Sequence, residues 1–288
     1  MEARRKEANA AFADFNQDGI NDLFLGAGGT LYGQKDYLFF GNGDGTFTDE
    51  TSRLENRPQQ PSNGSVICDY DNDGDLDLYV ANGHLSGNSA LDYCTRFWCH
   101  DVYTGTSKPN QTLDTFFSGK LSGLGSNYSW NGFEHNHLFL NKQNSGFHNV
   151  AFLLGTAFEF DARAVVTADI DVDGRKDLLV VQYDSQAKQQ RLFVMKNQIP
   201  AKGNWIGLHI TDFAGQPANG ATVQLFAGKR RDIVQLVTGD SFTAQHPSTA
   251  HFGLGENGSV DKLVIRWPSG KTKTLDQPAT GKYHTVTP

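Results

Sequence analysis

The stretch DFNQDGIND at residues 14–22 returns as DYDNDGDLD at residues 69–77 and as DIDVDGRKD at residues 169–177. Each copy fits the pattern D-x-[DN]-x-D-G-x-x-D, in which oxygen-bearing side chains alternate along the chain and one glycine follows them. Calcium binds about six to eight oxygens from carboxylates, amides and backbone carbonyls, and the glycine permits the sharp turn around the ion. The pattern therefore predicts three calcium loops.

These loops differ from EF-hand loops, which close with a glutamate at position 12 and continue into a helix. Position 12 is occupied here by Leu25, Val80 and Val180, and position 9 is an aspartate in every copy. The residues after position 9 are LFLG, LYVA and LLVV, short apolar runs that are typical of buried strands. We therefore expect calcium loops that join β-strands. The alternative is a set of hairpin turns, rich in Asp, Asn and Gly, that hold no metal.

A second repeat overlays the first. The stretch DYLFFGNGDGTFTDETSRL from Asp36 parallels NHLFLNKQNSGFHNVAFLL from Asn136, and the loops at 69 and 169 share the same offset. A unit of several strands that recurs at a spacing of about 50 residues is typical of propeller blades. The second unit is lengthened by an insertion at about 83–134, which is rich in aromatic residues. Within it, Cys94 and Cys99 are close enough in sequence for a short disulfide, whereas Cys68 is expected to be a buried strand residue.

The repeat stops after Asn197. The following stretches, including NWIGLHITDF, ATVQLFAG and SVDKLVIRWPSG, alternate apolar and polar residues between turns. This pattern predicts a compact antiparallel β domain. The predicted organisation is therefore all-β, with partial propeller blades in residues 1–198 and a small antiparallel β domain in residues 199–288.

These motifs resemble a known family. The D-x-D-x-D-G-x-x-D-L loops resemble the FG-GAP (VCBS-type) repeats of integrin-α-like propellers. The tail, from NGATVQLFAG through TAHFGLGENGSVDKLVIRWPSG, resembles the ASPIC/UnbV domain that follows such repeats in the cartilage acidic protein family. The resemblance implies a propeller built around calcium and covers nearly the whole chain apart from the insertion. Members of this family usually carry further repeats and a signal sequence upstream, which suggests that this chain is a fragment.

By this resemblance, each of the three calcium ions is held by four side chains and one backbone carbonyl. The implied ligands are Asp14, Asn16, Asp18, Asp22 and the Ile20 carbonyl; Asp69, Asp71, Asp73, Asp77 and the Asp75 carbonyl; and Asp169, Asp171, Asp173, Asp177 and the Arg175 carbonyl. The first loop has an amide at Asn16 where the other two have a carboxylate, so we expect it to be the weakest of the three sites.

Composition narrows the function further. The net charge is −7, and three bound divalent cations would bring it close to zero. The sequence has no basic stripe, which argues against nucleic-acid binding, and no apolar run long enough for a transmembrane helix. No export signal is recognisable at the start of this chain, MEARRKEANAAF. Loops of this kind are useful where calcium is abundant, so we nevertheless expect an extracellular or cell-surface protein.

Three functions are consistent with these features. The first is a non-enzymatic, calcium-binding adhesion or interaction module whose insertion contacts a protein or glycan ligand. The second is an enzyme on a propeller scaffold that acts on a polysaccharide or small molecule, with FEHNH (residues 133–137) as its metal-binding or catalytic centre, joined by His100 and Asp101. The third is a self-assembling subunit, a homo-oligomer in which neighbouring copies complete the propeller.

Overall fold

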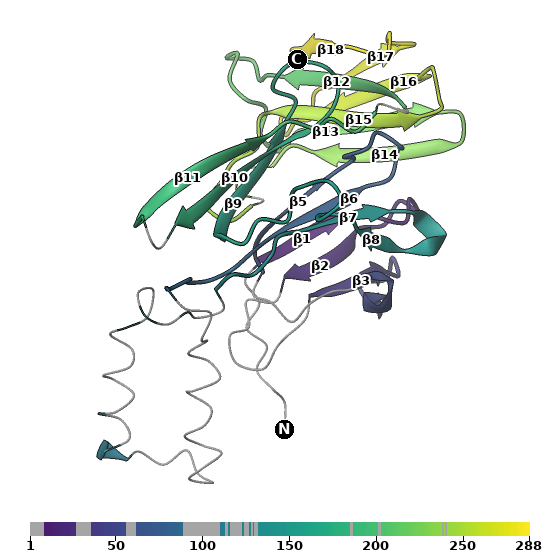
Figure 1. The fold of residues 1–288 in the computed structure, drawn as a ribbon. Coiled ribbons are helices and arrows are strands. Elements are labelled where there is room, and N and C mark those ends of the chain that lie inside the picture. Colours follow the sequence, from purple (N-terminus) through teal and green to yellow (C-terminus); the bar gives the residue numbers. More distant parts are fainter. Residues whose placement is uncertain are drawn as a thin grey trace.

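The computed structural model describes residues 9–26, 36–55, 62–88, 132–184, 187–200, 203–237, 239 and 241–288, with scattered residues between 110 and 129. This part of the chain is nearly all β and forms five small sheets (Figure 1). Two short 3₁₀ helices, η1 (Thr51–Arg53) and η2 (Gln143–Ser145), accompany the strands. The predicted all-β fold is confirmed. Most of the insertion, together with Cys94 and Cys99, lies outside the described residues.

The first two sheets are four-stranded antiparallel meanders, called here blade 1 and blade 2. Their strands are β1 (Asn9–Ala13), β2 (Asp22–Gly26), β3 (Tyr37–Gly41) and β4 (Phe47–Asp49), then β5 (Ser62–Cys68), β6 (Asp77–Asn82), β7 (His137–Asn141) and β8 (Phe147–Asn149). The offset of 100 residues is kept in the register: Gly41 pairs with Phe47 in blade 1, and Asn141 pairs with Phe147 in blade 2. The insertion separates β6 from β7.

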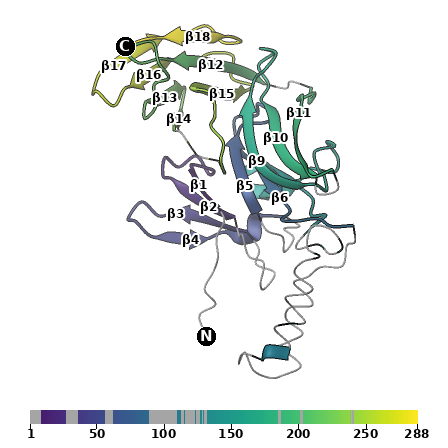
Figure 2. The same cartoon turned by 90° about the vertical axis from the view of Figure 1, so that its left-hand side faces the viewer.

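The third sheet, blade 3, consists of three antiparallel strands: β9 (Asp161–Ala168), β10 (Asp177–Asp184) and β11 (Gln189–Met195). The first strands of the blades lie next to one another, β1 beside β5 and β5 beside β9. Figure 2 shows blades 1 and 3 at the two ends of an arc with β5 and β6 between them. This arrangement is the partial propeller that the repeat predicted.

Cys68 ends β5 with a free thiol, whose pKa is raised by burial.

Each blade packs on the next through apolar side chains. Between blades 1 and 2 the buried residues are Phe15, Phe24, Leu38, Leu54, Leu78, Val80, Phe139 and Phe147. Between blades 2 and 3 they are Val66, Tyr70, Tyr79, Ala81, Leu138, Ala151, Ala162, Val165, Leu178 and Val180. Because side chains alternate between the two faces of a strand, β6 contributes Leu78 and Val80 to the first core and Tyr79 and Ala81 to the second. Its apolar run LYVA is therefore continuous.

The carboxy-terminal sheets comprise seven strands in two layers around a third apolar core. The strands are β12 (Asn204–Ile210), β13 (Thr222–Ala227), β14 (Arg230–Gln235), β15 (Thr249–Gly255), β16 (Lys262–Arg266), β17 (Thr272–Asp276) and β18 (Tyr283–Val286). All pairings are antiparallel except that of β12 with β18, which is parallel and departs from the predicted pattern. It arises because the chain leaves β17 in one sheet and returns to the other beside β12. The boundary between residues 198 and 199 stays a prediction.

Candidate metal centre

The three aspartate-rich loops occupy the same place in each blade, between its first and second strands. Their backbones also match. The residues at positions 4 and 6 have positive φ in every copy: 60° and 85° for Gln17 and Gly19, 57° and 102° for Asn72 and Gly74, and 59° and 86° for Val172 and Gly174. Glycine adopts this conformation without a steric penalty, whereas valine is strained in it. The prediction that these loops join strands is confirmed.

The aspartate at position 9 joins each loop to its blade. Asp22, Asp77 and Asp177 are buried, and each accepts two backbone hydrogen bonds. One comes from the residue at position 2, at 2.8, 2.7 and 3.0 Å, respectively. The other comes from the last residue of the third strand in blades 1 and 2, Gly41 at 3.0 Å and Asn141 at 2.8 Å, and from Asn197, just after β11, at 2.8 Å. These bonds fix the position of one carboxylate at the base of every loop.

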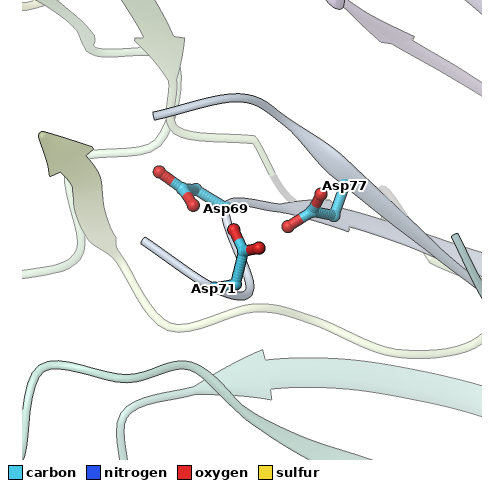
Figure 3. Close-up of side chains that lie close together, drawn as sticks. All are labelled: Asp69, Asp71 and Asp77. Carbon is cyan, nitrogen blue, oxygen red and sulfur yellow. The ribbon is translucent and has the colours of Figure 1, made fainter. Parts of the chain in front are cut away.

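The second loop gathers three carboxylates, those of Asp69, Asp71 and Asp77, whose oxygens lie within 4.8 Å of one another. Figure 3 shows the three side chains near one another, Asp69 and Asp71 on the loop and Asp77 at the start of β6. Burial, followed by the charge of neighbouring carboxylates, raises the pKa of Asp69 and of Asp77 well above the ordinary value of 3.8. Asp69 Oδ1 is buried and has no hydrogen-bond partner. A buried carboxylate oxygen without a donor fits a cation, because an ion would supply the missing positive charge.

A lysine side chain contacts the outer side of this cluster. Lys142 Nζ lies 2.6 Å from Asp71 Oδ2 and 2.6 Å from Asp73 Oδ2. Burial alone would lower the pKa of Lys142, but the two carboxylates raise it above its ordinary value. The lysine therefore offsets part of the negative charge at two of the predicted ligands. It leaves Asp69 Oδ1 unpaired.

The third loop gathers Asp169, Asp171 and Asp177 within the same 4.8 Å limit. Its aspartates also have cationic neighbours, since Lys196 contacts Asp171 and Arg175 contacts Asp173. Tyr283 of β18 donates a hydrogen bond from its hydroxyl to Asp169 Oδ2 at 3.0 Å. This cluster is more open than the second one, because Asp171 is exposed whereas Asp71 is half-buried.

The first loop has the same fold but gathers its acids less closely. Asp14, Asp18 and Asp22 do not form a third carboxylate cluster of this kind within the described residues. Asn16 Nδ2 instead donates a hydrogen bond to Asp18 Oδ2 at 2.9 Å. The amide thus replaces a charge repulsion with a hydrogen bond. Two acidic clusters that could hold a metal ion are therefore present, and the assignment of individual ligands, including the carbonyls of Ile20, Asp75 and Arg175, stays a prediction.

Successive loops are joined by side-chain amides that the motif analysis did not single out. Gln17 Nε2 donates to the Gly74 carbonyl and Asn72 Nδ2 donates to the Gly174 carbonyl, both at 2.8 Å. In each pair, the residue at position 4 of one loop reaches position 6 of the next. Two asparagines make the reverse bridges: Asn141, which ends β7, donates to the Phe15 carbonyl at 2.9 Å, and Asn197, just after β11, donates to the Tyr70 carbonyl at 2.7 Å. An amide side chain at position 4 of the first two loops is a sequence feature shared by the first pair of bridges, but it does not indicate which backbone group the amide reaches.

The second and third loops also contact the carboxy-terminal sheets. His251 Nε2 lies 3.0 Å from Asn72 Oδ1, and Arg230 donates to the Gly74 carbonyl at 2.8 Å. Gly253 lies so close that a Cβ atom added there would be 1.9 Å from Asp69 Oδ2. The candidate metal centres therefore lie at the junction between the blades and the carboxy-terminal sheets.

The FEHNH stretch, the alternative metal-binding or catalytic centre, lies at the entrance to β7. His135 Nε2 is 3.4 Å from Glu159 Oε1, whereas His137 Nδ1 is 2.6 Å from Asn149 Nδ2. Burial lowers the pKa of His137 to about 4. The two histidines thus have different partners, and neither they nor Glu134 belong to the two acidic clusters found among the described residues. His100 and Asp101 lie outside the described residues.

Comparison with known families supports the interpretation of both parts of the chain. Residues 14–80 match the FG-GAP-like repeat, and residues 214–288 match the family described as ASPIC and UnbV. The chain combines FG-GAP-like and ASPIC/UnbV sequence. The FG-GAP-like match spans the first two aspartate loops and continues into β6, so it includes one of the two acidic clusters.

The chain is homologous to cartilage acidic protein 1. It is 27% identical to the Homo sapiens protein in an alignment of 272 positions that covers 87% of this chain and 39% of that protein. It is also 27% identical to the Xenopus tropicalis protein and 25% identical to the Mus musculus protein, over 83% and 82% of this chain and 38% of each relative. The chain therefore spans about two fifths of the length of these relatives. Within the described residues, no helix has the length and apolar character needed to cross a membrane.

Proposed function

We propose that this chain is a calcium-stabilised interaction module that acts outside the cell. The observation that carries the proposal is the second acidic cluster, in which Asp69 Oδ1 is buried without a hydrogen-bond partner beside Asp71 and Asp77. Clusters of carboxylates suit a hard divalent cation such as calcium. Extracellular calcium-binding modules bind the ion weakly, at the calcium concentrations found outside cells. The FG-GAP-like match and the similarity to cartilage acidic protein 1 agree with this proposal.

Calcium would neutralise the clustered carboxylates of the loops. The bound ion would stabilise the contacts that the loops make. Asn72 joins the second loop to the third, and Arg230 and Tyr283 join these two loops to the carboxy-terminal sheets. Fixing the loops therefore fixes the angle between the blades and the position of the carboxy-terminal sheets. The proposed role is that of a rigid scaffold that presents its surfaces to a protein or glycan.

The test compares calcium-dependent stability in matched variants. Thermal unfolding of the wild-type chain should show a higher midpoint in millimolar calcium than in chelator, because only the folded state assembles the clusters. Asp69→Asn removes one carboxylate from the second cluster and should reduce this difference. Asp276→Asn removes the same charge from an exposed position in β17 and should leave it unchanged. The same midpoint with and without calcium in the wild-type chain would contradict the proposal.

The proposed place of partner contact is the aromatic-rich insertion at about 83–134. Aromatic side chains are enriched where proteins bind one another, and long loops on a rigid scaffold commonly carry binding residues. A chain in which a short Gly/Ser linker replaces residues 89–131 should keep its calcium-dependent midpoint but lose binding to extracellular matrix preparations. Unchanged binding of the shortened chain would place the contact elsewhere.

A further inference from the structure

The second loop contacts three other parts of the same chain. Gln17 of the first loop donates a hydrogen bond to the Gly74 carbonyl, and Asn72 donates one to the Gly174 carbonyl of the third loop. The third contact is with the carboxy-terminal sheets, in which Arg230 also donates to the Gly74 carbonyl. The loop in the middle of the three is therefore held from both neighbouring blades and from the carboxy-terminal sheets.

Strand β15 lies directly against the backbone of this loop. A Cβ atom added to Gly253 would be 1.9 Å from Asp69 Oδ2 and 2.7 Å from the Cα atom of Asn72. A Cβ atom added to Gly255 would be 2.7 Å from the carbonyl oxygen of Asp73. Only a strand with glycine at both positions can approach the loop this closely. The close approach covers the side of Asp69, which is 5% exposed.

Asn72 is the residue through which β15 holds the loop. Its carbonyl accepts a hydrogen bond from the backbone N–H of Gly255 at 3.1 Å, and its Oδ1 lies 3.0 Å from His251 Nε2. Its Nδ2 donates to the Gly174 carbonyl, which leaves Oδ1 as the acceptor and places a proton on Nε2 of His251. Asn72 is thus fixed at three of its polar atoms and is 1% exposed.

The position of Asn72 in the loop decides what this anchoring does to a bound ion. Asn72 lies between Asp71 and Asp73, whereas Asp69 and Asp77 are buried on the other side of the predicted site. An ion between these two groups of ligands is released when the segment that carries Asp71 and Asp73 moves outward. That movement breaks the three hydrogen bonds of Asn72.

We propose that the carboxy-terminal sheets act as a clamp on the second calcium site, so that the ion leaves only when β15 moves away from Asn72. The inference rests on the proposed function, because it takes the ion to be calcium held by this loop. Lys142 also contacts Asp71 and Asp73, but partly exposed side chains rotate within about nanoseconds. Lids and packed elements open in about microseconds to seconds, so β15, and not Lys142, sets the rate of release.

Stopped-flow mixing of the calcium-loaded chain with a fluorescent calcium chelator tests the clamp. The wild-type chain should release one ion in a slow phase. His251→Phe keeps the aromatic stacking on Trp205 but removes the hydrogen bond to Asn72, so it should speed the slow phase by about fivefold. Asn72→Gly suits the positive φ of this position and removes both side-chain bonds, so it should speed release further.

His209→Phe is the matched control for the histidine variant. His209 is an exposed residue of β12 that stacks on Tyr283, and its replacement by another ring should leave the slow phase unchanged. A second measurement uses the unaltered chain. An ion that leaves only through an open clamp cannot be released faster than β15 opens, and hydrogen exchange of the Gly255 amide measures this opening when every opening leads to exchange.

The outcomes separate the clamp from calcium binding itself. Release that is faster than the opening of β15, or a slow phase that neither His251→Phe nor Asn72→Gly changes, would overturn the clamp. A calcium-dependent unfolding midpoint in the same chain would then leave the proposed function standing. A chain that releases no calcium and has the same midpoint in calcium and in chelator would overturn both.

Discussion

Tyr283 and Asp169 join the carboxy-terminal sheets to the third loop through a hydrogen bond of 3.0 Å from the tyrosine hydroxyl to Oδ2. The ring of Tyr283 packs against His209 at 4.7 Å and Trp205 at 4.9 Å, and Trp205 in turn covers Gly174 of the same loop. Burial, followed by the charge of Asp169, raises the pKa of Tyr283, so the hydroxyl keeps its proton and acts as the donor. The junction is thus anchored on one of the predicted calcium ligands.

Tyr283→Phe keeps this ring packing and removes only the hydroxyl. We expect a loss of about 1–2 kcal/mol in unfolding free energy, because the bond is made to a carboxylate and hydrogen bonds to charged groups are worth more than neutral ones. The loss should be larger in chelator than in calcium, since the ion offsets the charge of Asp169. Urea unfolding in both buffers measures it. An equal loss in the two buffers would show that the hydroxyl does not act through the loop.

Asn16→Asp restores a carboxylate at position 3 of the first loop. The change removes the amide hydrogen bond to Asp18, so the loop should be less stable in chelator and should bind calcium more tightly. Calorimetric titration should show one site gaining affinity by about tenfold while the others keep theirs. Asp44→Asn, in the hairpin between β3 and β4, is the control for altering an acidic turn outside the loops. Unchanged affinity would mean that the first loop binds no ion.

The strands and the three loops could be predicted from the sequence because the same residue types recur at the same positions in each loop. Position 6 needs a glycine, position 9 needs an aspartate that caps backbone amides, and the following run must be apolar on both sides. The contacts between repeats could not be predicted in this way. The bridge from Asn72 to Gly174 joins residues about one hundred positions apart, and Gln17 makes its counterpart with a different side chain.

The contacts between the loops and the carboxy-terminal sheets also could not be predicted from the sequence pattern. Tyr283 lies in the last strand, and its role follows from the parallel pairing of β18 with β12, which the alternation of apolar residues does not predict. The same holds for Gly253, whose close approach to Asp69 depends on the position of β15. Local periodicity specifies the strands, whereas the packing of one sheet on another requires the tertiary structure.

Lys142→Gln tests the role of the lysine at the second cluster. Its ammonium group lies between Asp71 and Asp73, so its removal should leave these carboxylates to repel one another in chelator. The unfolding midpoint should fall in chelator and recover in calcium, which widens the difference between the two. Lys229→Gln, at an exposed position between β13 and β14, is the matched control. An equal fall of the midpoint in both buffers would mean that the lysine stabilises the fold independently of the cluster.

The effect of pH on calcium stabilisation follows from the pKa values of Asp69 and Asp77, which burial raises well above 3.8. In chelator the folded state then holds protons that the unfolded state has released, so these two residues make the fold less stable as pH rises from about 4 through their raised pKa values. Calcium favours the ionised carboxylates, so the difference in midpoint between calcium and chelator should grow from about pH 4 to pH 7.

The buried histidine His137 changes the pH dependence of stability in the opposite direction. Its effect must be separated from that of the aspartates. Burial lowers the pKa of His137 to about 4, so this residue makes the fold more stable as pH rises from about 4 to 6.5. Its contribution is the same in both buffers and cancels in their difference. Melting curves recorded across this pH range in calcium and in chelator therefore separate the groups at the loops from His137. Asp77→Asn should flatten the growth of the difference with pH, and a difference that stays constant in the wild-type chain would show that these carboxylates do not hold the ion.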